Sequence, residues 1–191
     1  METRVKEVRL KSLELRAAEE EAENMTIEGY AIVFDEPTDL GYIEIIERGA
    51  LDDCDMSDVA LKYNHEDSTP IMARTRNKSL QLNVDDHGLK IRAELIDTQS
   101  NRDLYKSIKA GLLDKMSFAF LVSDANWDTV DGQDVRRITG ISKLFDVSVV
   151  DFPAYDQTEV YARSQEACDK EHKEYKKLKF EKEKLLLQLS L

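Results

Sequence analysis

A serine lies inside an apolar run in the second half of this 191-residue chain. The run reads DKMSFAF from residue 114 to 120, with Met116 before Ser117 and Phe118 after it. A hydroxyl in this setting can be a hydrogen-bonded core group, an ordinary strand residue that faces solvent, or a nucleophile that attacks a carbonyl carbon. Nucleophilic serine chemistry needs a base that takes the hydroxyl proton and a third group that orients the base. The stretch alone leaves the three interpretations open.

The chain has three histidines, so few residues are candidates for the base. His65 follows an apolar segment and belongs to the cluster Asn-His-Glu-Asp, where the end of a strand can hold a side chain at the rim of a fold. His87 lies in a predicted hairpin turn and His172 in a highly charged segment, and we expect both to be solvent-exposed surface residues. The sequence therefore favours His65 as the base, with an ordinary surface histidine as the alternative.

A metal site in the same cluster is not expected. His65, Glu66 and Asp67 are consecutive, and neighbouring side chains of an extended segment point to opposite faces, which makes them a poor ligand set. The sequence contains no HExxH motif, and it predicts no cofactor.

Two acidic residues of the segment LFDVSVVDFP are candidates for orienting the base. Asp146 and Asp151 project to opposite faces if the strand is regular. Asp146 shares its face with Leu144, Ser148 and Val150. Because an apolar strand tolerates a carboxylate in its middle only where a partner satisfies it, this placement favours Asp146. The alternative is a buried aspartate with a purely structural role.

The elements that must position these residues are mostly strands. Alternating or apolar stretches predict strands at 8–15, 25–34, 59–63 and 135–154. The tetrapeptide Asp85-Asp86-His87-Gly88 joins two alternating runs and predicts a β-hairpin. The stretch around Ser117 is predicted as a further strand, followed by a polar loop around Trp127 and Gly132.

Helical spacing occurs in two places. The segment SNRDLYKSIKAGLL predicts a helix over 100–113, with Ser100 or Asn101 as its N-cap. Residues 164–191 contain no glycine or proline. They carry seven lysines and six acidic residues and are thus nearly neutral, whereas the rest of the chain has a net charge of −13. We therefore predict a domain of residues 1–163 and a charged, leucine-ended helical tail of residues 164–191, which either binds a partner or stays solvated.

Composition excludes several classes of protein. With 41% hydrophobic residues the chain can bury one substantial core. A net charge of −12 argues against a nucleic-acid binder, because contact with phosphates needs a cationic face. The cysteines, Cys54 and Cys168, predict no disulfide framework. The first residues lack the apolar centre of a signal peptide, and no run of about 18 apolar residues occurs, so we expect a cytosolic protein without a membrane span.

The motifs resemble, in their order, those of the prohead maturation proteases of tailed bacteriophages, a family similar in fold to the herpesvirus assemblin proteases. The motifs are GYAIVF, RGAL, LKYNHED, GLKIRAEL, KAGLLDKMSFAF and LFDVSVVDFPAYD. The resemblance covers roughly residues 5–162, and the joint order of the motifs is more specific than any one of them. Many short strands with one helix in the middle of the chain already predict a mostly β barrel or sandwich with α decoration (α+β). The resemblance implies that this fold is an assemblin-like closed or partly closed β-barrel, flanked by helices and followed by the helical tail.

Carried over residue by residue, the resemblance implies that His65 is the base, Ser117 the nucleophile and Asp146 the orienting acid. The family more often has glutamate at the position of Asp146 and asparagine at that of Tyr155. The implied activity is that of a serine endopeptidase which cuts capsid and scaffold proteins, and itself, during prohead maturation. We add the hypothesis that backbone N–H groups of residues 154–156 stabilise the oxyanion.

The implied partners are the major capsid protein and a scaffold segment as substrates, together with a second copy of the chain; neither nucleic acid nor membrane is expected. The implied location is the host cytoplasm, inside the assembling prohead. Two other functions stay open. One is a non-enzymatic scaffold or assembly protein with a protease-like core, and the other is a cytosolic esterase with the same serine and histidine.

Overall fold

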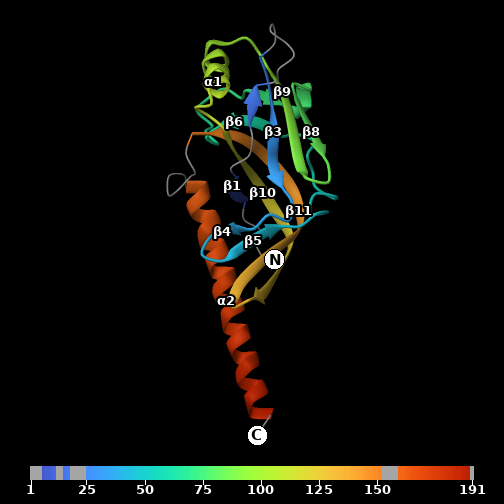
Figure 1. The fold of residues 1–191 in the computed structure, drawn as a ribbon, viewed down its shortest axis with the longest axis vertical. Coiled ribbons are helices and arrows are strands. Elements are labelled where there is room, and N and C mark those ends of the chain that lie inside the picture. The colour runs from blue at the N-terminus through green and yellow to red at the C-terminus, as the bar shows by residue number, and fades with distance from the viewer. Residues whose placement is uncertain (1–5, 12–14, 18–24, 152–158, 190–191) are drawn as a thin grey trace.

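Strands dominate the described part of the chain, and they form two sheets (Figure 1). The structure is a computed structural model that describes residues 6–11, 15–17, 25–151 and 159–189. The larger sheet has the order β1-β10-β11-β5-β4, with β6 paired to β11 and β7 paired to β6. Its strands are β1 (Lys6–Lys11), β4 (Thr38–Asp39), β5 (Ile43–Ile46), β6 (Ala60–Tyr63), β7 (Ala73–Arg74), β10 (Lys115–Val130) and β11 (Gln133–Val150).

The smaller sheet has the order β2-β3-β9-β8 and packs with the larger one around a shared apolar core. Its strands are β2 (Arg16–Ala17), β3 (Met25–Val33), β8 (Leu80–Val84) and β9 (Gly88–Leu95). A short 3₁₀ turn, η1 (Thr75–Asn77), and two helices, α1 (Gln99–Lys109) and α2 (Glu159–Leu189), complete the described elements. Fully buried side chains from both sheets form the core, among them Ile27, Ile91, Phe118, Phe120 and Leu144.

The prediction of a mostly β, α+β fold is confirmed, but the described strands do not close into a barrel. Among the described strands, β1 pairs only with β10 at one end of the main path of the larger sheet, and β4 pairs only with β5 at the other end. The strands β2 and β8 are the edges of the smaller sheet. A closed barrel is therefore wrong for this part of the chain, because the edge strands of each sheet have no hydrogen-bonded partner that would complete a ring.

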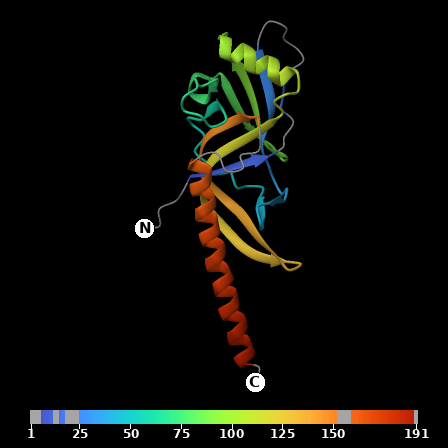
Figure 2. The same ribbon diagram turned by 90° about the vertical axis from the view of Figure 1, so that its left-hand side faces the viewer.

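The hairpin of β10 and β11 corrects the predicted polar loop around Trp127. The two strands stay paired from Lys115–Val150 to Val130–Gln133, so Trp127 lies within β10. The turn consists of Asp131 and Gly132, whose φ angles of 51° and 81° suit a two-residue hairpin turn. Figure 2 shows the hairpin extending beyond the rest of the body, beside α2. Its outer part is polar because it is a two-stranded ribbon largely exposed to solvent, and this polarity resembles that of a loop in the sequence.

The second hairpin and the first helix agree with the sequence. Strands β8 and β9 are joined where the sequence predicted, and Tyr30 donates a hydrogen bond of 2.8 Å to Asp85 in the turn. His87 lies in this turn with its ring edge-on to that of Tyr30. The N-cap of α1 is Thr98, which accepts a hydrogen bond from the Asn101 N–H, so the predicted caps Ser100 and Asn101 are wrong by two or three residues.

Gly88 begins β9 where the chain passes close to β3. A Cβ at this position would lie 2.0 Å from the Ile32 carbonyl oxygen, so backbone would have to move. We expect Gly88→Ala to lower the free energy of unfolding by about 1–3 kcal/mol, the usual cost of overpacking. Urea unfolding followed by circular dichroism measures the effect. As a control, Gly41→Ala meets no atom within 4 Å and reports only the cost of a left-handed residue. An unfolding midpoint for Gly88→Ala equal to that of the wild type would contradict the prediction.

The helix α2 begins before the predicted boundary at Arg163, since it covers Glu159–Leu189. As far as Lys179, which donates a hydrogen bond to Thr129, the helix lies beside the body and the β10–β11 hairpin, and the rest of it projects away (Figures 1 and 2). The large apolar side chains of its second half are exposed; they are Leu178, Phe180, Leu185, Leu186, Leu187 and Leu189. The division of the chain into residues 1–163 and 164–191 stays a prediction.

His172 was predicted to be solvent-exposed, but its side chain is only 12% exposed. Its ring stacks on that of Trp127 with centroids 4.7 Å apart, and its Nε2 lies 2.8 Å from Asp134 Oδ2. The charged sequence around His172 suggested solvent exposure, but one side of α2 faces the hairpin. Cys168 is buried on the same side of the helix.

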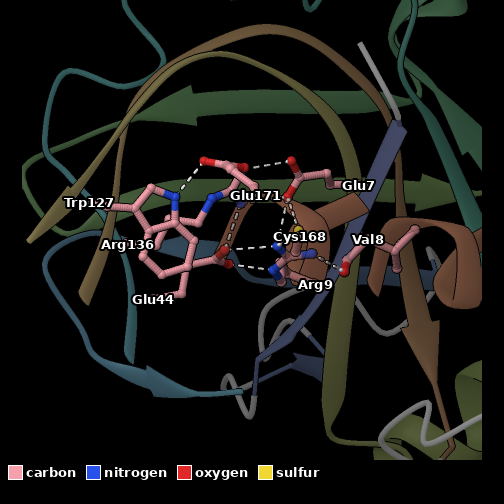
Figure 3. A network of polar contacts seen from close by, with 8 residues as sticks. All are labelled: Glu7, Val8, Arg9, Glu44, Trp127, Arg136, Cys168 and Glu171. Carbon is pink, nitrogen blue, oxygen red and sulfur yellow. Dashed lines mark hydrogen bonds and ion pairs between the residues drawn. The ribbon is translucent and has the colours of Figure 1, made fainter. Parts of the chain in front are cut away.

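Four buried charges link β1, β5 and β11 beneath α2 (Figure 3). Arg9 binds Glu44 with two guanidinium nitrogens and reaches Glu7 over 2.6 Å. Arg136 bridges the same two carboxylates over 2.8 Å and 2.9 Å. Burial acts to raise the pKa of Glu44, but the charges and hydrogen bonds of both arginines outweigh it and hold the pKa below its ordinary value. The two positive and two negative charges therefore compensate one another in the interior.

The helix α2 closes this network from one side. Glu171 accepts hydrogen bonds from Arg136 Nη2 at 2.8 Å and from Trp127 Nε1 at 2.6 Å. Cys168 Sγ lies 3.3 Å from Arg9 Nη2, and burial raises the pKa of its thiol. These contacts of Cys168 and Glu171 attach the first half of α2 to β1, β10 and β11, which are distant in the sequence.

Candidate active site

The side chains of His65, Ser117 and Asp146 meet in the larger sheet. His65 Nε2 lies 2.5 Å from Ser117 Oγ, although 52 positions separate the residues in the sequence. The other ring nitrogen, Nδ1, is hydrogen-bonded to Asp146 Oδ1. Ser117 and Asp146 are each 1% exposed. The structure thus brings together all three residues that the sequence analysis selected.

Strand pairing explains why the three residues converge. Ser117 lies near the start of β10 and Asp146 near the end of β11, and the antiparallel register places Ala119 opposite Asp146. Strand β6 runs parallel to β11 on its other side, with Ala60 beside Asp146 and Tyr63 beside Val149. The chain leaves β6 at Tyr63 and turns. The ring of His65, in this turn, reaches over β11 to Ser117 on β10.

The turn after β6 has an unusual backbone. Asn64 and His65 both have positive φ angles, 52° and 57°, in the left-handed region that non-glycine residues seldom adopt. Asparagine is one of the residues that tolerate this conformation best. The Asn64 N–H donates to the Val149 carbonyl over 2.9 Å, and its Oδ1 accepts from the Asp151 N–H over 3.3 Å. These bonds hold two left-handed residues in sequence and aim the imidazole at Ser117.

The hydrogen bonds define the roles that the ring nitrogens can take. Because Asp146 is an acceptor, Nδ1 of His65 carries the hydrogen and Nε2 presents its lone pair to Ser117. The Ser117 hydroxyl has a single hydrogen, and the Arg9 carbonyl of β1, at 2.8 Å, is an alternative acceptor for it. The imidazole can therefore accept the proton of Ser117 when the hydroxyl hydrogen is directed at Nε2 instead of at the Arg9 carbonyl.

Asp146 stays ionised although it is buried. Burial acts to raise the pKa of the carboxyl, but the hydrogen bond from His65 and the charge of Lys6 outweigh it, so the pKa of Asp146 lies below its ordinary value. Lys6 Nζ is 3.2 Å from Asp146 Oδ2. A buried carboxylate that remains charged beside an imidazole can stabilise the imidazolium formed when the ring takes a proton.

The sequence matches one known family over most of its length. Residues 11–173 match the family model of the caudovirus prohead serine proteases. The chain belongs to this family. The prohead protease of Escherichia phage T5 is 31% identical over 115 residues, which cover 60% of this chain and 50% of that protein. The chain therefore spans about half the length of the curated relative.

A solved structure is similar at low sequence identity. The bacteriophage T4 capsid assembly protease aligns with a TM-score of 0.49 and 12% identity, over 76% of this chain and 98% of that chain. Among the helices that the structure describes, none is sufficiently long and apolar to cross a membrane.

The side chains of the other candidates from the sequence contact different residues. Asp151 is exposed and accepts a hydrogen bond of 3.2 Å from the Tyr63 hydroxyl. His87 and His172 pack against Tyr30 and Trp127. The residues proposed for the oxyanion site, 154–156, lie outside the described residues.

Three groups of the site were missed in the sequence. Ser148 lies two residues after Asp146, and its position on the same face of the strand was the available signal. Lys6 and the Arg9 carbonyl come from β1, more than a hundred positions from Asp146 and Ser117. No local pattern marks them, because their contacts result from the pairing of β1 with β10.

Proposed function

We propose that this chain is a serine endopeptidase which cuts capsid and scaffold proteins during maturation of a phage prohead. The observation that carries the proposal is the 2.5 Å distance between His65 Nε2 and Ser117 Oγ, with Asp146 behind the imidazole. Membership of the caudovirus prohead serine protease family supports the same activity. The catalytic roles of the three residues are part of this proposal.

The mechanism follows from the hydrogen bonds. His65 Nε2 takes the proton of Ser117 Oγ as this oxygen attacks the scissile carbonyl carbon, and the resulting imidazolium donates the proton to the leaving amine. Asp146 keeps the hydrogen on Nδ1 and stabilises the imidazolium. Water then attacks the acyl carbon while the same imidazole takes its proton. The imidazolium returns this proton to Ser117 Oγ as the bond between the acyl carbon and Oγ breaks and the acid product leaves. Because Ser117 is almost completely covered, the neighbouring segments must move apart locally when a peptide binds.

The substrates and location belong to the same proposal. The name of the T4 structural neighbour, a capsid assembly protease, describes a protein that acts in capsid assembly. For this chain we propose the major capsid protein and a scaffold segment as substrates, and the interior of the assembling prohead in the host cytoplasm as the place of action. Self-association, self-cleavage and a partly closed, assemblin-like barrel stay predictions.

The experiment combines the chain with the capsid and scaffold proteins of its own phage. We expect the wild type to cut them at discrete positions when they are co-expressed, as measured by intact-protein mass spectrometry. A fluorophosphonate probe should label the purified wild type at Ser117. Turnover of activated esters without any cleavage of capsid or scaffold protein would favour the esterase. Neither cleavage nor labelling would favour an assembly protein with a protease-like core.

A further inference from the structure

The carboxylate of Asp146 has more hydrogen-bond donors than a Ser-His-Asp arrangement requires. Oδ1 accepts from His65 Nδ1 and, at 3.1 Å, from the Ser148 hydroxyl. Oδ2 lies 3.2 Å from Lys6 Nζ. Donors from β1, β11 and the turn after β6 thus surround one carboxylate.

Ser148 is placed to hold both partners of the His65–Asp146 pair. It is completely buried, and its Oγ lies 3.1 Å from Asp146 Oδ1 and 3.1 Å from His65 Nδ1. Since the Nδ1 hydrogen is directed at Asp146, the Ser148 hydroxyl donates to Oδ1 and its oxygen touches the edge of the imidazole. Ser148 is also directly opposite Ser117 in the ladder of β10 and β11. The hydroxyl therefore contacts the carboxylate and the imidazole at the same time.

Lys6 holds the second oxygen of the carboxylate. Its side chain, 36% exposed, reaches across from β1, and its Nζ also lies 5.0 Å from the centre of the Phe145 ring. A cation beside a carboxylate favours the ionised form, which buried carboxyl groups otherwise lose. Because part of Lys6 is in contact with solvent, its effect is expected to be weaker than that of Ser148.

We propose that Ser148 and Lys6 are positioning residues, which keep Asp146 ionised and hold its carboxylate in the orientation that His65 needs. Neither residue touches the reacting atoms. The inference rests on the proposed function for its effect on catalysis, but its effect on the carboxylate of Asp146 is independent of activity. Asp146 and His65 would thus act as parts of a larger unit to which β1 contributes.

The test uses Ser148→Ala, Ser148→Thr and Lys6→Met. We expect Ser148→Ala to slow the labelling of Ser117 by a fluorophosphonate roughly 10- to 100-fold, the effect of losing one hydrogen bond to a charged group. Lys6→Met should slow it less, and Ser148→Thr, which keeps the hydroxyl, should recover part of the rate. In Ser148→Ala and Lys6→Met the pKa of Asp146 should rise, because each variant removes a donor or a cation that favours the ionised carboxylate.

Two variants are matched controls. Ser142→Ala removes a hydroxyl from β11, the strand that also carries Ser148. The Ser142 hydroxyl donates to the Leu121 carbonyl and not to Asp146. Lys143→Met removes a lysine whose Nζ also lies near Phe145, at 5.6 Å, but which pairs with Asp55. Both controls should keep the wild-type labelling rate and pH profile, because neither group contacts Asp146.

A carboxyl NMR titration of Asp146, assigned with Asp146→Asn, separates the two proposals. If the wild type is not labelled, the proposed protease function fails, and the titration alone decides the positioning roles. An Asp146 carboxyl that titrates at the wild-type pH in folded Ser148→Ala and Lys6→Met would overturn the inference. Equal labelling of these variants and the wild type at every pH would overturn it as well.

Discussion

Replacing Ser117 with alanine is expected to reduce proteolysis of capsid and scaffold proteins by about 10⁶-fold, the loss seen when a serine nucleophile is removed from such a unit. The physical reason is that a methyl side chain at position 117 could form no acyl-enzyme, although the His65–Asp146 pair would remain. The cleaved fraction after co-expression, determined by intact mass, measures the effect.

The series His65→Ala, Ser117→Ala and the double variant tests whether the two residues act together. Each single variant should lose nearly all cleavage, and the double variant should lose no more, because an imidazole without the hydroxyl has no proton to accept. Ser123→Ala is the control, since Ser123 is an exposed residue of the same strand, β10. Cleavage by Ser117→Ala at the wild-type sites and rate would contradict the proposed function.

Arg136→Met is expected to lower the free energy of unfolding by about 3–5 kcal/mol at pH 7, the cost of removing one partner from a buried ion pair. Arg136 is 2% exposed, and its loss leaves Arg9 as the arginine that binds the carboxylates of Glu7 and Glu44 among the described residues. Domains of this kind are stable by only about 5–15 kcal/mol, so the variant would be close to unfolding. Urea unfolding followed by circular dichroism measures the change.

The pH dependence of this effect has a definite sign. The pKa of Glu44 is lowered in the folded state, so its contribution to stability is complete above the ordinary glutamate pKa, about 4.3, and is lost as the pH falls through the folded-state pKa. The difference between Arg136→Met and the wild type should therefore become smaller in acid.

Arg137→Met is the matched control, because this neighbouring arginine is partly exposed and lies 3.3 Å from Glu47. Its loss should change the stability by no more than about 1 kcal/mol. A cost for Arg136→Met that is as small as that of Arg137→Met would contradict the role assigned to the buried network.

Local sequence patterns predicted those helices and hairpins that are stabilised mainly by residues close together in the sequence. The hairpin at Asp85-Asp86-His87-Gly88 was predicted because its turn residues and the flanking alternation suit one conformation. The helix α1 was predicted from its apolar spacing, but its cap was misplaced by a few residues, since Thr98, Ser100 and Asn101 are all polar residues at the same end. Residues 65, 117 and 146 were selected from their types and from the family resemblance.

Polarity misled the prediction where a charged or polar segment has a partner. Trp127 and His172 both lie in polar sequence, yet their rings stack on each other, because the hairpin of β10 and β11 and the helix α2 face one another. Arg9 and Arg136 likewise look like ordinary surface charges in the sequence, although each is buried against Glu44.

The amino-acid sequence by itself determined the local elements of this protein and which residues are chemically able to act as base, nucleophile and acid. Only the tertiary structure decided that they meet, because the parallel pairing of β6 with β11 and the antiparallel pairing of β10 with β11 set the distance from His65 to Ser117. Long-range pairing also supplied Lys6 from β1. The physical reason is that side-chain type and periodicity act within a few residues, whereas burial and charge compensation depend on segments that become neighbours only in the folded chain.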